Sequence, residues 1–180
     1  MKNRKTIIVG FILVACMIMG VGYAVLTDSL EVGGTAEIKK DAAEDAFDFD
    51  VRFTNATAVT PGNTTSINAD NDDKVSFTAS SLAEKDDVAT FEYEVTNSSD
   101  LIAKIASTDI DANVTTLTAD DGTVTTPSES IFEVTYSWNT ETIAANGGTA
   151  ILTVHVKLKE TPTVYAKGTF TLTISVISEE

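Results

Sequence analysis

Apolar and polar side chains alternate with a period of two along several segments of this 180-residue chain, as is typical of strands with one buried face. Residues 152–158 are the clearest case, because Leu or Val alternates there with Thr, His and Lys. The same alternation predicts strands at residues 47–53, 91–95, 131–138 and 170–176, and shorter strands at 35–39, 74–79, 101–107 and 113–117. Successive side chains of a strand point to opposite sides, so each of these segments has one face to bury.

The segments between the expected strands are rich in turn-forming residues, and no amphipathic helix of useful length is present. Examples are Pro61-Gly62-Asn63 and Asn146-Gly147-Gly148, and residues 81–87 could form at most a single helical turn. Many strands with one apolar face each imply two sheets packed face to face. We therefore predict one all-β domain over residues 41–180, a two-sheet antiparallel sandwich of jelly-roll or immunoglobulin-like topology.

The chain is strongly acidic, with 27 Asp and Glu residues against 12 Lys and Arg residues and a net charge of −15. Affinity for nucleic acid depends on clustered Lys and Arg, so this composition argues against a nucleic-acid partner. Hydrophobic residues make up 43% of the chain, which is too much for a disordered acidic tail. The single Cys excludes a disulfide framework within one chain.

Residues 1–24 have the composition of a signal peptide. Three basic residues lie among the first five, and the following apolar run, residues 6–26, is long enough to cross a bilayer as a helix. Gly22 and Ala24 supply the small side chains that a signal peptidase needs at positions −3 and −1. We therefore expect cleavage after Ala24, a mature chain that starts at Val25, and contact with the membrane only through the leader before cleavage.

Two other interpretations of the leader stay open. The apolar run could remain as an uncleaved anchor, or residues 13–16 could be a lipoprotein box with Cys16 as the lipidated residue. Cleavage after Ala24 would remove three of the 12 basic residues and no acidic one, so the net charge of the mature chain would be 9 − 27 = −18. We expect this acidity to keep a β-rich surface soluble and to limit self-association.

The chain has few of the groups that enzymes use near neutral pH. His155 is its one His and falls on the outward side of an expected strand, and its one Cys lies in the leader. A zinc protease of the His-Glu-x-x-His type needs two His, and no Gly-rich phosphate loop is present in the sequence. We therefore predict a non-enzymatic protein with no catalytic residue and no cofactor.

One acidic segment has the spacing of a candidate calcium loop. Asp109, Asp111, Asn113 and Asp120 place oxygen atoms at positions 1, 3, 5 and 12 of a twelve-residue window. An EF-hand loop needs Gly at position 6, where this chain has Val114, and the longer Glu at position 12. The same segment also fits a strand with three apolar side chains facing inward: Ile110, Ala112 and Val114. These residues are therefore weak metal candidates, and no metal site is predicted.

Three segments resemble a family of exported proteins. Residues 22–32 read Gly-Tyr-Ala-Val-Leu-Thr-Asp-Ser-Leu-Glu-Val, which is similar to the leaders of Gram-positive exoproteins cut by the dedicated SipW-type signal peptidase. Residues 49–55 resemble the second strand of the same proteins, and residues 88–105 resemble their central strand and turn. On these segments the chain resembles the TasA/camelysin family of biofilm matrix fibre proteins. Many leaders of this family carry an aromatic residue where this chain has Leu26.

The resemblance implies a secreted jelly-roll protein that forms extracellular fibres by donor-strand exchange. Residues 25–40 would then be the donor segment, since they offer apolar side chains on an otherwise polar stretch: Leu26, Leu30, Val32, Ala36 and Ile38. The alternative is that residues 35–39 pair within their own sandwich. Camelysin relatives have been classed as metallopeptidases, but this sequence shows no metal-ligand set that would support that activity.

We therefore expect a structural protein of a biofilm matrix or cell surface, whose partners are other copies of itself and other matrix proteins. A monomeric adhesion or binding module with the same fold is the alternative.

Overall fold

The computed structural model describes residues 30–40, 49–119 and 122–179, and the only regular structure in them is β-strand. The strands in chain order are β1 (Leu30–Lys40), β2 (Val51–Ala58), β3 (Thr64–Asn68), β4 (Asn71–Thr78), β5 (Val88–Asn97), β6 (Ile102–Thr118), β7 (Val124–Thr125), β8 (Phe132–Trp138), β9 (Thr142–Ile143), β10 (Gly148–Leu158) and β11 (Tyr165–Glu179).

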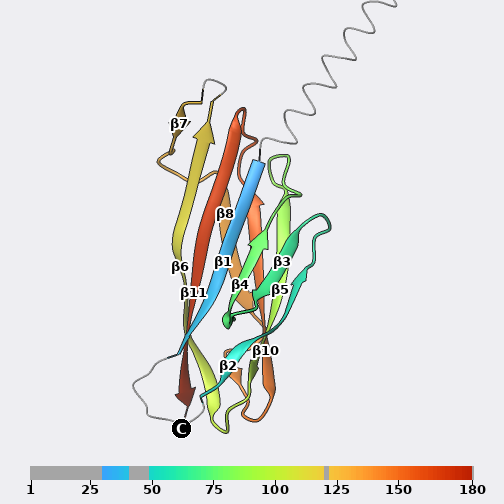
Figure 1. The fold of residues 1–180 in the computed structure, drawn as a ribbon, viewed down its shortest axis with the longest axis vertical. Coiled ribbons are helices and arrows are strands. Elements are labelled where there is room, and N and C mark those ends of the chain that lie inside the picture. The colour runs from blue at the N-terminus through green and yellow to red at the C-terminus, as the bar shows by residue number, and fades with distance from the viewer. Residues whose placement is uncertain (1–29, 41–48, 120–121, 180) are drawn as a thin grey trace, which may run out of the picture.

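These strands form two sheets that pack face to face as an elongated sandwich (Figure 1). Sheet A has the strand order β3-β4-β1-β11-β6-β7, with β9 also paired to β6, and sheet B has the order β2-β5-β10-β8. The predicted two-sheet β-sandwich is confirmed. Its antiparallel character has one exception, because β1 runs parallel to β11.

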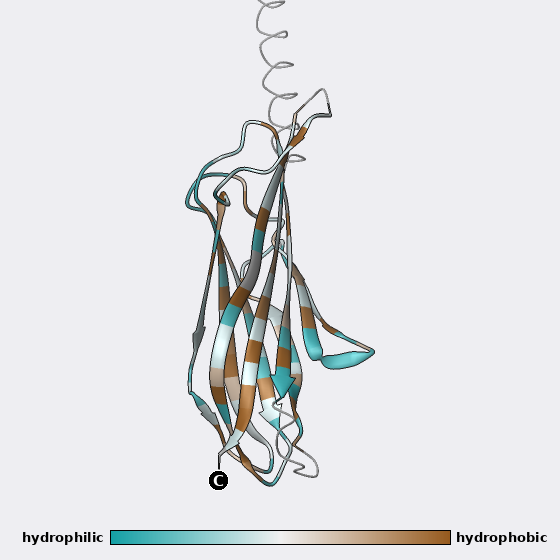
Figure 2. Cartoon of the chain, turned by 90° about the vertical axis from the view of Figure 1, so that its left-hand side faces the viewer, coloured by the Kyte–Doolittle hydropathy of each residue, from teal (hydrophilic) through white to brown (hydrophobic). Residues whose placement is uncertain are grey.

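The core lies between the sheets and follows the alternation of the sequence (Figure 2). On β10 every second side chain is fully buried, from Ala150 through Leu152 to Leu158, while Thr153 and Lys157 face outward. The local pattern therefore identified the buried face of this strand correctly, because one face of each half-buried strand must be apolar.

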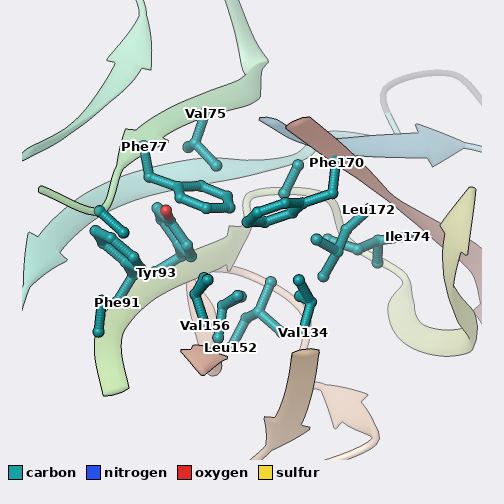
Figure 3. Packing of buried hydrophobic residues seen from close by; sticks show 14 of the residues in the cluster. Val75, Phe77, Phe91, Tyr93, Val134, Leu152, Val156, Phe170, Leu172 and Ile174 are labelled. Atoms are coloured by element: carbon teal, nitrogen blue, oxygen red, sulfur yellow. The ribbon is translucent and has the colours of Figure 1, made fainter. Parts of the chain in front are cut away.

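Aromatic rings occupy the middle of the core (Figure 3). The ring centroids of Phe77 and Phe170, both in sheet A, are 4.9 Å apart, and Phe77 also lies 4.8 Å from Phe91 of sheet B. Beside them Phe53 and Tyr93 meet edge to face at 5.8 Å. Burial raises the pKa of the Tyr93 hydroxyl, which is hydrogen-bonded to a Thr65 hydroxyl at 3.1 Å.

A buried amide fixes the end of β5. Asn97 is fully buried, and its Nδ2 donates hydrogen bonds to the carbonyl oxygens of Leu101 at 2.7 Å and Ile143 at 3.2 Å. Its Oδ1 accepts a hydrogen bond from the Ser99 backbone N–H at 3.1 Å. Because buried polar groups need such partners, Asn97 joins the β5–β6 turn to the segment that leads into β10.

The predicted strands are found, with shifted ends. The strand predicted at residues 47–53 begins only at Val51 in β2, and residues 47–48 lie outside the described residues. Residues 101–107 and 113–117 belong to one long strand, β6, whose pairing with β11 is interrupted by two register shifts. The alternation of the sequence does not predict β3, β7 and β9, because these strands are short and mostly exposed and so lack a strong apolar period.

Candidate functional site: the position of β1 between β4 and β11

The proposed donor segment lies within the sandwich of its own chain. The described part of it, β1, pairs with β11 over its whole length and, on its other side, with residues 74–78 of β4. The alternative that residues 35–39 pair in their own sheet is therefore what this structure shows. We call the place between these stretches of β4 and β11 the β1 position.

The apolar side chains predicted for self-assembly face the core. Val32 and Ala36 are fully buried, Ile38 is 3% exposed, and Leu30 is partly buried against the same cluster. Leu26 lies outside the described residues. Burying such side chains is the main source of stability in a sandwich, so β1 forms part of the core.

Polar contacts hold β1 to β4. The Ala79 N–H donates a hydrogen bond to the Val32 carbonyl at 2.8 Å, just beyond the end of β4. Along the same pair of strands, Lys74 Nζ lies 3.1 Å from a Glu37 carboxylate oxygen, and Lys40 Nζ lies 3.1 Å from Asp73 Oδ1. These ion pairs are partly exposed and add little to stability by themselves, so backbone pairing and burial dominate.

Gly34 is an inward-facing residue of β1 that was not among the predicted self-assembly residues. It is the Cα partner of Phe77 on β4 and of Phe170 on β11, so a residue without a side chain stands between two Phe residues. The Gly33-Gly34 pair in the middle of an apolar strand was the available signal, since a Gly inside a strand often marks a close approach of other groups.

The residues predicted at the signal cleavage site, Gly22, Ala24 and Val25, lie outside the described residues, as does the whole of 1–29. Within the residues that the structure describes, no helix is long and apolar enough to span a bilayer.

The weak calcium candidates lie on a strand. Asp109 and Asn113 both belong to β6 and are exposed, and Asn113 Nδ2 donates a hydrogen bond to the Phe132 carbonyl at 3.2 Å. Asp111 is also a β6 residue, while Asp120 lies outside the described residues. Among residues 30–40, 49–119 and 122–179, no three His, Cys, Asp or Glu side chains gather closely enough to hold a metal ion.

The inward direction expected for the apolar residues of this segment is wrong in part. Ile110 is the Cα partner of the buried Leu172 and is 37% exposed, whereas Val114 lies on the outward side and is 44% exposed. A register shift between β6 and β11 near Thr171 changes which side chains face inward, and Val114 then stands beside the exposed Thr169.

His155 lies on the outer face of sheet B. Its Nδ1 is 3.0 Å from the Thr90 hydroxyl, and its cross-strand neighbours are Thr90 and Thr135. The Thr90 hydroxyl gives this imidazole a hydrogen-bonding partner. His155 is therefore a half-buried residue on the outer face of the sheet, as the alternation of this strand predicted.

On the opposite side of the sandwich, the edges of the two sheets are joined. Trp138 Nε1 on β8 donates a hydrogen bond to the Thr108 hydroxyl of β6 at 3.0 Å, and the Tyr136 hydroxyl donates to the Thr108 carbonyl. These bonds give part of the β6 edge a partner, and an edge with a partner is less open to other strands. We therefore take the β1 position as the candidate functional site.

Comparison of the chain with protein-family models and with curated proteins finds no match.

Proposed function

We propose that this protein is a secreted structural protein whose copies assemble into extracellular or biofilm matrix fibres by exchanging β1, as in the TasA/camelysin family that it resembles. The observation that carries the proposal is the pairing of β1. All its strand partners are remote in sequence, since β4 begins at Asn71 and β11 at Tyr165. Every contact that β1 makes in its own chain could be made equally by β1 of another copy.

The chain between β1 and β2 supports such an exchange. Ten residues, 41–50, separate the end of β1 at Lys40 from the start of β2 at Val51. A connection of that length can reach roughly 30 Å when extended, enough to lead β1 away from its own sandwich. Signal peptide cleavage would release the N-terminal end of β1, which cannot enter another subunit while it is held in a membrane.

A monomeric surface module is the second candidate function. It is favoured by the completeness of the sandwich, in which β1 already fills the middle of sheet A of its own chain. The two functions differ in one measurable respect, which is whether β1 ever pairs with β11 of another copy.

A disulfide placed between β1 and β11 tests this directly. The chain from Val25 onward contains no Cys, and Thr35 and Thr171 are Cα partners on the outer face of sheet A. In the double variant Thr35→Cys/Thr171→Cys, neighbouring strands bring the two Cys within disulfide range. Oxidation of the dilute monomer should lock β1 in place and abolish fibres in electron micrographs, and reduction should restore them.

The order of the two steps gives the decisive result. If the reduced variant first assembles and is then oxidised, the disulfides should join different copies and produce a ladder on a non-reducing gel. The matched control is Glu92→Cys/Thr153→Cys, which links β5 to β10 at partner positions within sheet B and should give single chains under both protocols. Fibres that yield only single chains after oxidation would refute strand exchange, and a failure to form fibres would favour the monomeric module.

A further inference from the structure

We propose that Gly34 determines which strand can fill the β1 position and in which register it does so. For a strand that comes from a second copy of the chain, this inference rests on the proposed function. For β1 of the same chain it stands on the structure of the sandwich alone.

The space at Gly34 excludes any side chain. A Cβ atom added there would lie 2.5 Å from Cζ of Phe77 and 2.7 Å from Cε2 of Phe170. At the neighbouring Gly33, on the outer face of the same strand, the nearest atom would be the Phe77 backbone oxygen at 3.6 Å, an ordinary contact. Neither glycine has a positive φ, so the backbone of both positions would accept other residues. The two positions therefore differ in the space available for a side chain.

The two rings beside Gly34 are held in the packed core. Phe77 and Phe170 are each 3% exposed and pack against one another, and Phe77 also packs against Phe91 of the opposite sheet. Figure 3 shows Phe77 and Phe170 side by side over the side chains of sheet B. A Cβ at position 34 would displace at least one ring of this packed group, which is the overpacking that protein cores tolerate poorly.

Side-chain size along β1 is complementary to that along β11. Val32 stands beside Gly168, where the Phe132 ring of sheet B leaves no room for a Cβ, and Gly34 stands beside Phe170. The next two inward residues of β1 meet side chains of intermediate size on β11, in the pairs Ala36–Leu172 and Ile38–Ile174. At Val32–Gly168, Gly34–Phe170 and Ala36–Leu172 a larger residue of one strand thus meets a smaller residue of the other, and only Ile38–Ile174 pairs two residues of equal size.

This complementarity fixes the register. A shift of β1 by one residue would turn its polar face toward the core, and a shift by two would keep the apolar face inward. The two-residue shift, however, brings either Val32 or Ala36 to the place between Phe77 and Phe170. Among the registers that keep the apolar face of β1 inward, only the observed one puts a residue without a Cβ there, so Gly34 selects both the strand and its alignment. The occupant that meets this requirement is β1, from the same chain or from a second copy.

The first part of the test compares Gly34→Val with Gly33→Val in the chain that starts at Val25. Both changes add the same β-branched side chain to the same strand, and only the first meets the two Phe rings. We expect Gly34→Val to unfold at a markedly lower temperature than the unchanged chain. The variant should also form no fibres at about ten times the concentration at which the unchanged chain assembles. Gly33→Val should match the unchanged chain in both measurements.

The second part leaves the full chain unchanged, so that misfolding of a variant cannot explain the result. A synthetic peptide with the sequence of residues 30–40 is added during assembly, where it should occupy the β1 position and shorten the fibres. The same peptide with Gly34→Val should have no effect at equal concentration, whereas the peptide with Gly33→Val should act like the unchanged peptide. Fibre length in electron micrographs is the readout.

The outcomes separate the inference from the proposed function. Equal behaviour of the two Val variants in thermal unfolding, or equal activity of the two Val peptides, would overturn the role of Gly34. If the unchanged chain forms no fibres, the proposed function fails, and a lower unfolding temperature for Gly34→Val than for Gly33→Val would still support the role of Gly34 within the monomer.

Discussion

The two sheets of this sandwich have central strands of different character. In sheet B, β10 lies between β5 and β8, antiparallel to both, and its buried face carries Leu152, Val154, Val156 and Leu158. In sheet A, β1 lies between an antiparallel β4 and a parallel β11. Only two residues on the buried face of β1, Val32 and Ile38, are both large and buried, against four on β10, so β1 contributes less apolar area to the core.

Sequence distance adds to this difference. Only nine residues, 139–147, separate β8 from β10, and Asn97 ties the segment before β10 to the end of β5. β1 instead meets β11 across more than a hundred residues of chain. A strand with small side chains and no partner close in sequence can leave and be replaced at lower cost than a strand with large side chains and a short connection to one of its partners. Under the proposed function, β1 and not β10 is therefore the strand that we expect to exchange.

The largest expected effect is on β10. Replacing the fully buried Leu152 by Ala should lower the free energy of unfolding by about 2–5 kcal/mol, because the lost methyl groups leave a cavity in the core. Val32→Ala on β1 removes fewer carbon atoms and should cost less, about 1–3 kcal/mol. Urea unfolding at neutral pH measures both.

Thr153→Ala serves as the control, since Thr153 faces outward next to Leu152 and should change the free energy of unfolding by about 0.5 kcal/mol or less. An equal loss for Val32→Ala and Leu152→Ala would show that β1 is as firmly held as β10.

The second prediction concerns local opening of the monomer. The free energy of the opening that permits hydrogen exchange of the backbone amides should be about 1–3 kcal/mol lower in β1 than in β10. Strands with less buried area open without global unfolding. Mass spectrometry of peptides from residues 30–40 and 148–158 measures this difference. Identical exchange at the level of global unfolding would remove the thermodynamic basis for exchanging β1.

The smallest expected effect is that of the ion pair at the end of β10. Lys157 Nζ lies 2.7 Å from a carboxylate oxygen of Asp86, and this hydrogen bond holds the pKa of Asp86 below its usual value and raises the pKa of Lys157. The pair therefore stabilises the fold between about pH 4 and about pH 10. Its contribution disappears as the pH falls through the lowered pKa of Asp86 or rises through the raised pKa of Lys157.

Asp86→Asn should accordingly lower the Tm slightly at pH 7 and leave it unchanged at a pH low enough to protonate Asp86. Asp100→Asn, at another exposed Asp, is the comparison variant. Both groups of the pair are exposed to solvent, and a large effect at pH 7 would mean that surface charges contribute to holding β10.

The sequence was sufficient for the fold class and for most of the core. The alternation of residues 152–158, 91–95 and 170–176 identified strands and buried faces correctly, because the period of two is a local property of each segment. The alternation was less reliable near Asp109, where a register shift between β6 and β11 reverses the direction of side chains. Such a shift depends on the partner strand, which no local pattern contains.

The candidate site was predicted only in part. Val32, Ala36 and Ile38 were recognised as apolar residues of an interacting strand, but the sequence left open whether they pair in their own sandwich, and Gly34 was not singled out. The reason is that the importance of Gly34 comes from Phe77 and Phe170, which are far from it in the chain and adjacent to it only after folding.

By itself, then, the sequence determined that this chain forms strands with one buried face, because residue polarity and spacing act within each segment. Only the tertiary structure decided that β1 lies between β4 and β11, parallel to the last strand, and that one Gly is placed between two Phe rings. Those features depend on the fit of side chains from remote segments, which is settled when the sheets assemble and the core is packed.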